Sequence, residues 1–317
     1  MLSGLEAGFG LDVVTWLQAH GNGVFDALAV GLHLAGGELV YLALLLLIFW
    51  SVDRRLGIRL LFALLAANVT TEALKFLFQT PRPHIAHPEV VTPLVEQGGY
   101  GIPSGHVLIA LVVWGYAALW LRRRAAWALA AAYVLLMAWA RLYAGVHYPQ
   151  DVVVGLIFGA ALLWLYARLV DAVAPRWDRL GLAVQLAAVV GVGVALAAVA
   201  WANEEGATAA GVVLGVGLGS IAEARWINFA VDGPAWQRAA RYVVGALLVM
   251  GVLFGLRAAF AGLEPQPLFR IVRYALASAV GFVVWPWLCV RAGLMPAAPG
   301  ATPSASDRQT DILNHQP

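Results

Sequence analysis

Apolar residues fill the chain in stretches of about 17 to 25, the length that crosses the hydrocarbon core of a membrane as a helix. Two shorter apolar segments, 11–20 and 25–34, are broken by glycines and predict interfacial or half-inserted helices. About nine spanning helices are expected after them, near 37–52, 57–79, 104–121, 125–141, 149–171, 180–202, 207–223, 239–260 and 271–291.

The composition agrees with a membrane protein and excludes soluble and fibrous classes. Of 317 residues, 62% are hydrophobic and 12% are charged, whereas a soluble domain carries about 25% charged residues. The sequence therefore predicts an all-α fold, a polytopic membrane helical bundle. A net charge of +2 gives no reason to expect a nucleic acid partner. Cys289 is the only cysteine, so neither an internal disulfide nor a cysteine metal site is possible.

Arginines indicate how the bundle is oriented. They cluster after the first, third, fifth and seventh predicted spans, at Arg54, Arg55, Arg59, Arg122, Arg123, Arg124, Arg168, Arg176, Arg179, Arg225, Arg238 and Arg241. All of these clusters fall on one side, which the positive-inside rule assigns to the cytoplasm. We therefore expect the N-terminus outside and the C-terminus in the cytoplasm, as in a protein of a bacterial inner (plasma) membrane.

The pattern divides the chain into four parts. They are an interfacial N-terminal segment at 1–36, a core of about five spans at 37–172, a C-terminal block of about four spans at 173–295, and a tail at 296–317. The tail is rich in Ala, Pro, Ser, Asp and Gln and has no periodic apolar face, which predicts disorder.

The C-terminal block carries no motif that indicates chemistry. Gly211, Gly215 and Gly219 form a small-xxx-small face suited to close helix packing. Its notable acids, Glu223 and Asp232, are interpreted as interfacial loop charges. A transport role would need ionisable groups near the middle of several spans.

Polar residues concentrate in the loops opposite the arginine clusters. Lys75, the only lysine, lies near the end of the second span, and Arg82 follows in the next loop. Snorkelling to the interface is the alternative explanation for Lys75. Glu72 lies one helical turn before Lys75, so the two side chains share a face. His84 and His87 have the spacing of a metal pair, but no further ligand accompanies them.

Two further segments on this side combine histidines with helix starts. Ser104 is a plausible N-cap for a helix that begins with Gly105 and His106, and such a helix start binds anions. In the next outer segment Arg141 precedes His147, and Asp151 lies four residues after that histidine. Asp151 can therefore reach His147 and fix the position of its ring proton.

Together these segments supply three cations, a helix N-terminus and two histidines. Phosphoryl transfer without a metal requires such a set. The cations and backbone amides neutralise the oxygens of the transferring group, one imidazole attacks phosphorus, and the other protonates the leaving oxygen.

The three motifs resemble those of a known family. K-x6-R-P at Lys75 to Pro83, P-S-G-H at Pro103 to His106 and R-x5-H-x3-D at Arg141 to Asp151 match the tripartite signature of the type 2 phosphatidic acid phosphatase superfamily. The resemblance covers roughly residues 20–172, about half of the chain. It implies an integral membrane phosphatase that needs no metal or other cofactor.

The resemblance also implies a role for each motif residue. His147 would be the nucleophile that forms a phosphohistidine, oriented by Asp151, and His106 would be the general acid and then the base for water. The phosphate would be held by Lys75, Arg82, Ser104, Gly105 and Arg141. One departure is visible, because the third motif of the family usually begins Ser-Arg and here Ala140 precedes Arg141.

The expected function is hydrolysis of a lipid phosphate or diphosphate at the outer membrane face. Undecaprenyl diphosphate, phosphatidate, phosphatidylglycerophosphate and sphingoid phosphates all have a head group at the interface and a tail in lipid. The alternatives are a phosphotransferase with a lipid or sugar acceptor, and a soluble-substrate phosphatase that resembles glucose-6-phosphatase. A non-catalytic lipid-binding or transport protein, or a vanadium haloperoxidase, fits the motifs and spans less well.

Overall fold

The computed structural model describes residues 6–199 and 204–298, and in this part of the chain the regular elements are all helices, with one isolated bridge besides them. The predicted all-α fold is confirmed. The first half comprises the π-helix η1 (Glu6–Gly10) and helices α2 (Leu11–Ala19), α3 (Gly23–Ala35), α4 (Glu38–Ser51), α5 (Arg54–Phe78), α6 (Pro83–Ala86), α7 (Gly105–Leu121), α8 (Arg124–Tyr143) and α9 (Pro149–Trp177). The second half comprises α10 (Leu182–Val199), α11 (Glu204–Ala222), η2 (Glu223–Ile227), α12 (Ala235–Ala259), α13 (Gln266–Ala279), η3 (Val280–Val284) and α14 (Trp285–Arg291).

A helix occupies the position of every predicted span, but the number of membrane crossings differs from the predicted count. Within the described residues, six helices are long and apolar enough to cross a membrane. Helices α3 and α4 are bent by 59° where they meet at Gly36 and Gly37, and together they could form a seventh span. Helices α7 and α10 are apolar but shorter. The count of nine stays a prediction.

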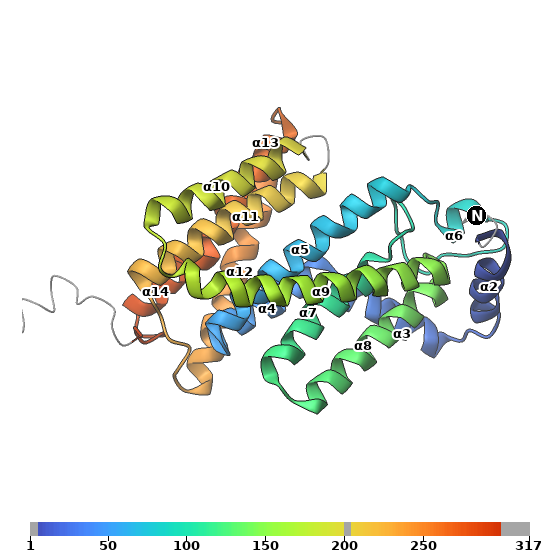
Figure 1. Cartoon of the computed structure of the whole chain (residues 1–317), viewed down its shortest axis with the longest axis horizontal. Coiled ribbons are helices and arrows are strands. Elements are labelled where there is room, and N and C mark those ends of the chain that lie inside the picture. The colour runs from blue at the N-terminus through green and yellow to red at the C-terminus, as the bar shows by residue number, and fades with distance from the viewer. Residues whose placement is uncertain (1–5, 200–203, 299–317) are drawn as a thin grey trace, which may run out of the picture.

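The two halves lie side by side along the long axis of the molecule (Figure 1). In the first half, α7 packs against α5, α8 and α9, while α3 packs on α8. In the second half, α11 packs against α10 and α13. Helices α4 and α5 connect the halves, because α4 also contacts α12 and α5 also contacts α11.

The predicted glycine face of α11 is the surface that contacts α13. A Cβ atom built on Gly211 would lie 2.5 Å from the carbonyl oxygen of Ile271, and one on Gly215 would lie 2.5 Å from the Cβ of Ser278. Such distances are too short for any residue larger than glycine. In lipid, helices associate through close van der Waals packing, because no hydrophobic force drives them together. The glycines therefore allow this pair of helices to pack closely.

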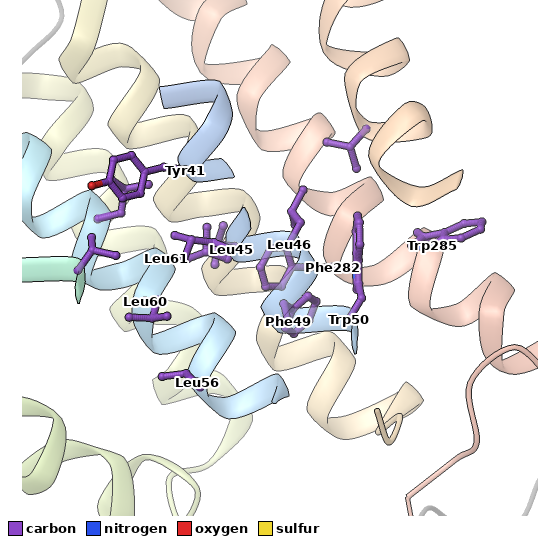
Figure 2. Close-up of a cluster of buried hydrophobic side chains, with 14 of the residues drawn as sticks. Tyr41, Leu45, Leu46, Phe49, Trp50, Leu56, Leu60, Leu61, Phe282 and Trp285 are labelled. Atoms are coloured by element: carbon purple, nitrogen blue, oxygen red, sulfur yellow. The ribbon is translucent and has the colours of Figure 1, made fainter. Parts of the chain in front are cut away.

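An aromatic cluster joins α4 to the C-terminal helices (Figure 2). The rings of Phe49 and Phe282 stack with centroids 4.4 Å apart. The indole of Trp50 donates to the carbonyl oxygen of Gly281 at 3.0 Å, and the indole of Trp285 donates to that of Arg241 at 2.9 Å. Both indole N–H groups are thus satisfied, so the cluster holds α4 in one position against the second half.

Glu223 differs from its interpretation as an interfacial loop charge, and Arg241 of the predicted cytoplasmic clusters is also buried. Glu223 is fully buried, and its carboxylate pairs with Arg54 at 2.7 Å. Arg241 is also fully buried and donates to the carbonyl oxygens of Trp50, Val231 and Asp232. Buried charges persist only when they are paired or hydrogen-bonded. Glu223 is therefore a structural link between the halves rather than a loop charge.

Two predicted boundaries fall inside ordered structure. The boundary between 172 and 173 lies within α9, which continues to Trp177. The predicted tail begins at Pro296, whose carbonyl oxygen accepts a hydrogen bond from Ala230 at 2.8 Å. Phe229 forms a bridge with Ala297 next to it. The remainder of the predicted tail, 299–317, lies outside the described residues.

Candidate active site

The three motifs lie at the same end of the first half. Helix α5 ends at Phe78, just after Lys75, and α8 ends at Tyr143, just after Arg141. Helices α7 and α9 begin at this end, at Gly105 and Pro149. Because neighbouring helices alternate in direction, the arginine clusters between α4 and α5 and between α7 and α8 lie at the opposite end.

His147 is held in one protonation form by two neighbours. Its Nε2 lies 2.9 Å from Nη1 of Arg82, and its Nδ1 lies 3.1 Å from Oδ2 of Asp151. A guanidinium only donates, so Nε2 of His147 must accept. The ring proton is then on Nδ1 and is donated to Asp151. This tautomer leaves the Nε2 lone pair as the reactive position of the imidazole.

The start of α9 explains why Asp151 meets His147. Pro149 occupies the first turn of the helix, where its missing N–H costs nothing. Oδ2 of Asp151 accepts the backbone N–H of Tyr148 at 2.9 Å, as a capping residue does. The carbonyl oxygen of Asp151 accepts the backbone N–H of Ser104 at 2.9 Å, which ties the second motif to the third.

Arg82 is fixed by backbone carbonyl groups as well as by His147. Its Nε donates to Gly98 at 3.0 Å and to Gly99 at 3.2 Å, and its Nη1 donates to Val146 at 2.9 Å. The residue is 1% exposed. These bonds aim the guanidinium at the imidazole and keep its positive charge inside the site.

Arg141 contacts two residues that the sequence analysis did not select. Its Nη1 donates to Nδ1 of His33 at 2.8 Å, and its Nη2 donates to the side-chain oxygen of Gln97 at 3.0 Å. The ring of His33 also stacks on His106 with centroids 5.3 Å apart. An ionisable residue in an apolar segment is a functional candidate, and this signal could have identified His33, which shares its helix with one other ionisable residue, Asp26.

Several polar atoms at the centre of the site have no hydrogen bond within the described part of the chain. They are Oγ of Ser104, Nε2 of His106 and Nε of Arg141, and all three are buried. Buried polar groups without partners are costly, and a bound ligand is one explanation for them. Ser104 precedes α7 as predicted, but its hydroxyl makes no capping bond. The hydroxyl is therefore available to an anion.

Lys75 pairs with Glu72 at 2.7 Å, as their shared helix face predicts. The side chain of Lys75 is 18% exposed, so it lies at the edge of the site rather than in bulk solvent. Its charge still acts on His147. The structure thus brings all eight predicted site residues to one end of the bundle.

Burial is the main cause that lowers the pKa of His147 well below its ordinary value, and the charges of Arg82 and Arg141 lower the pKa further. The imidazole is therefore neutral at pH 6.5. Because its folded-state pKa lies below the unfolded value, His147 also contributes stability above pH 6.5 that is lost as the pH falls toward the folded-state pKa.

We expect the His147 imidazole to remain neutral in an NMR titration of ¹⁵N-histidine-labelled protein at pH values below 6.5. The signal is assigned by its absence in the His147→Gln variant. A His147 signal that titrates at or above its ordinary pKa would contradict the electrostatic description of the site.

Ala140 and the two loop histidines, His84 and His87, make ordinary contacts. Ala140, which replaces the usual serine, is 1% exposed and packs with Ala29 of α3. No phosphate-binding hydroxyl is present at this position. His84 bonds the carbonyl oxygen of Gly145 at 3.2 Å, and His87 lies 3.4 Å from Glu89. In the described residues, no group of three metal-ligating side chains is found.

Comparison with known proteins identifies the family of both halves. Residues 56–174 match the PAP2 superfamily model, and residues 207–298 match a model described as PAP2 superfamily phosphatase, transmembrane extension. A crystal structure of Aquifex aeolicus LpxE covers 51% of this chain and 96% of its own, with 24% identity and a TM-score of 0.47.

Two curated relatives align with half of the chain. The lipid phosphate phosphatase delta of Arabidopsis thaliana is 28% identical over 50% of this chain, and the alignment spans 41% of the plant protein's length. The undecaprenyl-diphosphatase of Sulfolobus acidocaldarius is 30% identical over 50% of this chain and 77% of its own. The chain therefore belongs to the PAP2 superfamily.

Proposed function

We propose that this protein is a metal-independent membrane phosphatase that hydrolyses a lipid phosphate or diphosphate through a phosphohistidine at His147. The observation that carries the proposal is the pair of contacts on that imidazole. Asp151 holds the proton on Nδ1, and Arg82 points a positive charge at Nε2. A neutral nucleophile beside a cation is the arrangement that phosphoryl transfer needs.

In the first step, Nε2 of His147 attacks phosphorus and the bond from phosphorus to the leaving oxygen breaks. His106 donates its proton to that oxygen, which leaves as an alcohol, or as the lipid monophosphate when the substrate is a diphosphate. In the second step His106 takes a proton from water, and the resulting hydroxide attacks the phosphohistidine. Inorganic phosphate leaves and both histidines return to their starting forms.

The phosphoryl oxygens are neutralised by side chains rather than by an ion. Arg82, Arg141 and Lys75 supply positive charge, while Ser104 and the backbone amide of Gly105 donate hydrogen bonds at the positive end of α7. On binding, Arg82 exchanges its bond to Nε2 of His147 for one to a phosphoryl oxygen. This exchange frees the lone pair at the moment it is needed.

The charge pattern supports a site at the outer face. The motifs lie at the end of the bundle opposite the arginine clusters of the α4–α5 and α7–α8 connections. By the positive-inside rule those clusters are cytoplasmic, so the site faces outside a bacterial inner (plasma) membrane and the C-terminus is in the cytoplasm. A head group at the outer interface then reaches the site while its tail stays in lipid.

The four-part division remains part of the proposal, with two adjustments. The match over residues 56–174 supports a phosphatase core near 37–172, and the match over 207–298 supports a separate C-terminal block near 173–295. The N-terminal segment 1–36 belongs functionally to the core, because His33 contacts Arg141. The end of the block moves to residue 298, the last residue of the second match, whose backbone N–H donates to the carbonyl oxygen of Asn228 at 2.7 Å.

We expect the purified protein to release phosphate from at least one lipid in a panel, with activity that survives EDTA. The panel contains undecaprenyl diphosphate, phosphatidylglycerophosphate, phosphatidate and sphingosine-1-phosphate, with glucose-6-phosphate as the soluble substrate. Colorimetric phosphate release measures the rates. Strict dependence on Mg²⁺ would contradict the proposed chemistry, and release from glucose-6-phosphate alone would favour a soluble substrate. A labelled phosphohistidine without phosphate release would indicate a phosphotransferase.

A further inference from the structure

A cavity of about 800 Å³ lies between the two halves of the molecule. Helices α4 and α5 form one wall, and α11, α12 and α13 form the other, with Leu196 of α10 at the edge. The volume falls within the range of ligand sites, roughly 300–1,000 Å³. The lining is mostly aliphatic, so the cavity suits an apolar ligand.

Helix α5 presents one face to this cavity and another to the active site. Leu61, Leu65, Asn68 and Glu72 recur at the spacing of a single helical face and line the cavity. Thr71 lies on another face and packs so closely on α7 that a Cβ on Gly105 would come 2.9 Å from its methyl group. The cavity and the catalytic helices are thus separated by one helix.

The polar end of the cavity reaches Glu72, the ion-pair partner of Lys75. Glu72 lines the cavity and also pairs with Lys75 at 2.7 Å. Glu38 and Glu204, at the first residues of α4 and α11, line the same end. Phe76 lines it too and is 74% exposed, so this end is accessible.

The other end of the cavity is deep in the bundle and apolar. Leu46, Val249 and Phe282 line it beside the aromatic cluster (Figure 2). Below Glu72, the inner part of the cavity follows α5 for eleven residues, to Leu61, which is roughly 16 Å at about 1.5 Å per residue. That depth is about half of the ~30 Å hydrocarbon core, the depth of one lipid leaflet.

We propose that this cavity binds the hydrocarbon chain of the substrate lipid while its phosphate is held at Lys75. The inference rests on the proposed function. Substrate is the occupant because the polar end of the cavity adjoins Lys75 through Glu72, and the apolar end has the depth of a leaflet. The C-terminal block then acts in specificity, since its helices α11, α12 and α13 complete the wall around the chain.

A crosslinking experiment tests the binding site without needing turnover. The probe is dioleoyl phosphatidate with a diazirine near the end of one chain, added to the His147→Ala protein in micelles. We expect labelled peptides from the cavity-lining parts of α5, α11 or α12. Excess dioleoyl phosphatidate should suppress this labelling, and dioleoyl phosphatidylcholine should not. Equal suppression by both lipids, or labelling confined to outward-facing residues, would overturn the proposal.

Chain-length kinetics test the same site in the active enzyme. Leu253→Trp places a larger side chain into the cavity from α12, and Ala209→Phe does so from α11. We expect kcat/KM for dioleoyl phosphatidate to fall at least about tenfold while that for dihexanoyl phosphatidate stays within about twofold. Leu247→Trp is the matched control, because Leu247 on α12 is 68% exposed.

The outcomes separate this proposal from the proposed function. If the wild type hydrolyses both phosphatidates and the filled variants slow both equally, the cavity does not hold the chain. If the wild type hydrolyses neither phosphatidate, then phosphatidate is not a substrate and is removed from the substrates considered in the proposed function. The crosslinking pattern then still decides whether the cavity binds a phosphate-bearing lipid. If Leu253→Trp fails to fold, Ala209→Phe provides a second variant for the kinetic test.

Discussion

Replacement of His147 by alanine is expected to lower kcat/KM for the preferred lipid by at least about 10⁴. Removing the imidazole removes the atom that attacks phosphorus, and no second nucleophile occupies its place between Arg82 and Asp151. The measurement is phosphate release at saturating and at limiting lipid concentrations. Radioactive labelling with a ³²P-lipid adds a direct readout, because the wild type should form an acid-labile phosphohistidine and the His147→Ala variant should not.

The His147→Ala variant needs controls because the side chain of His147 is buried. His147 is 1% exposed, so replacing it by alanine leaves a cavity. His147→Gln keeps more of the volume and separates lost chemistry from lost packing. His20→Ala removes an exposed histidine that bonds only its own helix at Trp16. A phosphoenzyme that persists in both His147 variants would exclude this residue as the nucleophile.

Changing Asp151 to asparagine is expected to reduce kcat on the order of 10³ to 10⁴ with little change in KM. Asp151 acts through His147 and is therefore a positioning residue. An amide can offer its NH₂ group to Nδ1, which moves the ring proton to Nε2. The proton would then occupy the attacking position and oppose the N–H of Arg82, so the lone pair would be lost.

The ¹⁵N chemical shifts of His147 separate this explanation from a folding defect. The wild type should show the Nδ1–H tautomer, and the asparagine variant should stay folded and show the Nε2–H tautomer. Asp12→Asn, at an exposed position in the first turn of α2, is the matched control. An unchanged tautomer together with full activity would remove Asp151 from the mechanism.

Residue spacing in the sequence predicted those contacts of the site that join residues one helical turn apart. Asp151 follows His147 by four residues and Lys75 follows Glu72 by three, and both pairs are in contact. Periodic apolar stretches predicted where the helices lie, because a membrane imposes both their length and their composition. The glycine face of α11 was predictable for the same reason, since small residues at a four-residue spacing share one side of a helix.

Contacts between distant segments could not be predicted in this way. Arg82 bonds His147 across 65 residues, and Arg141 bonds His33 across 108. Such contacts depend on how whole helices pack, and no repeating pattern in the sequence records that packing. The cavity could not be predicted either, because in the sequence its lining residues have the pattern of ordinary lipid-facing or core positions. The burial of Glu223 was missed because its partner lies on the other half of the chain.

The ion pair of Arg54 and Glu223 has a consequence for biosynthesis. The two residues are 169 positions apart, and ribosomes add about 5–20 residues per second. Arg54 is therefore synthesised roughly 10–30 s before its partner has been made. During that interval the early helices must keep its charge near water or lipid phosphate. The final junction between α5 and the later helices can close only when nearly three quarters of the chain has been synthesised, which makes this contact a late step of assembly.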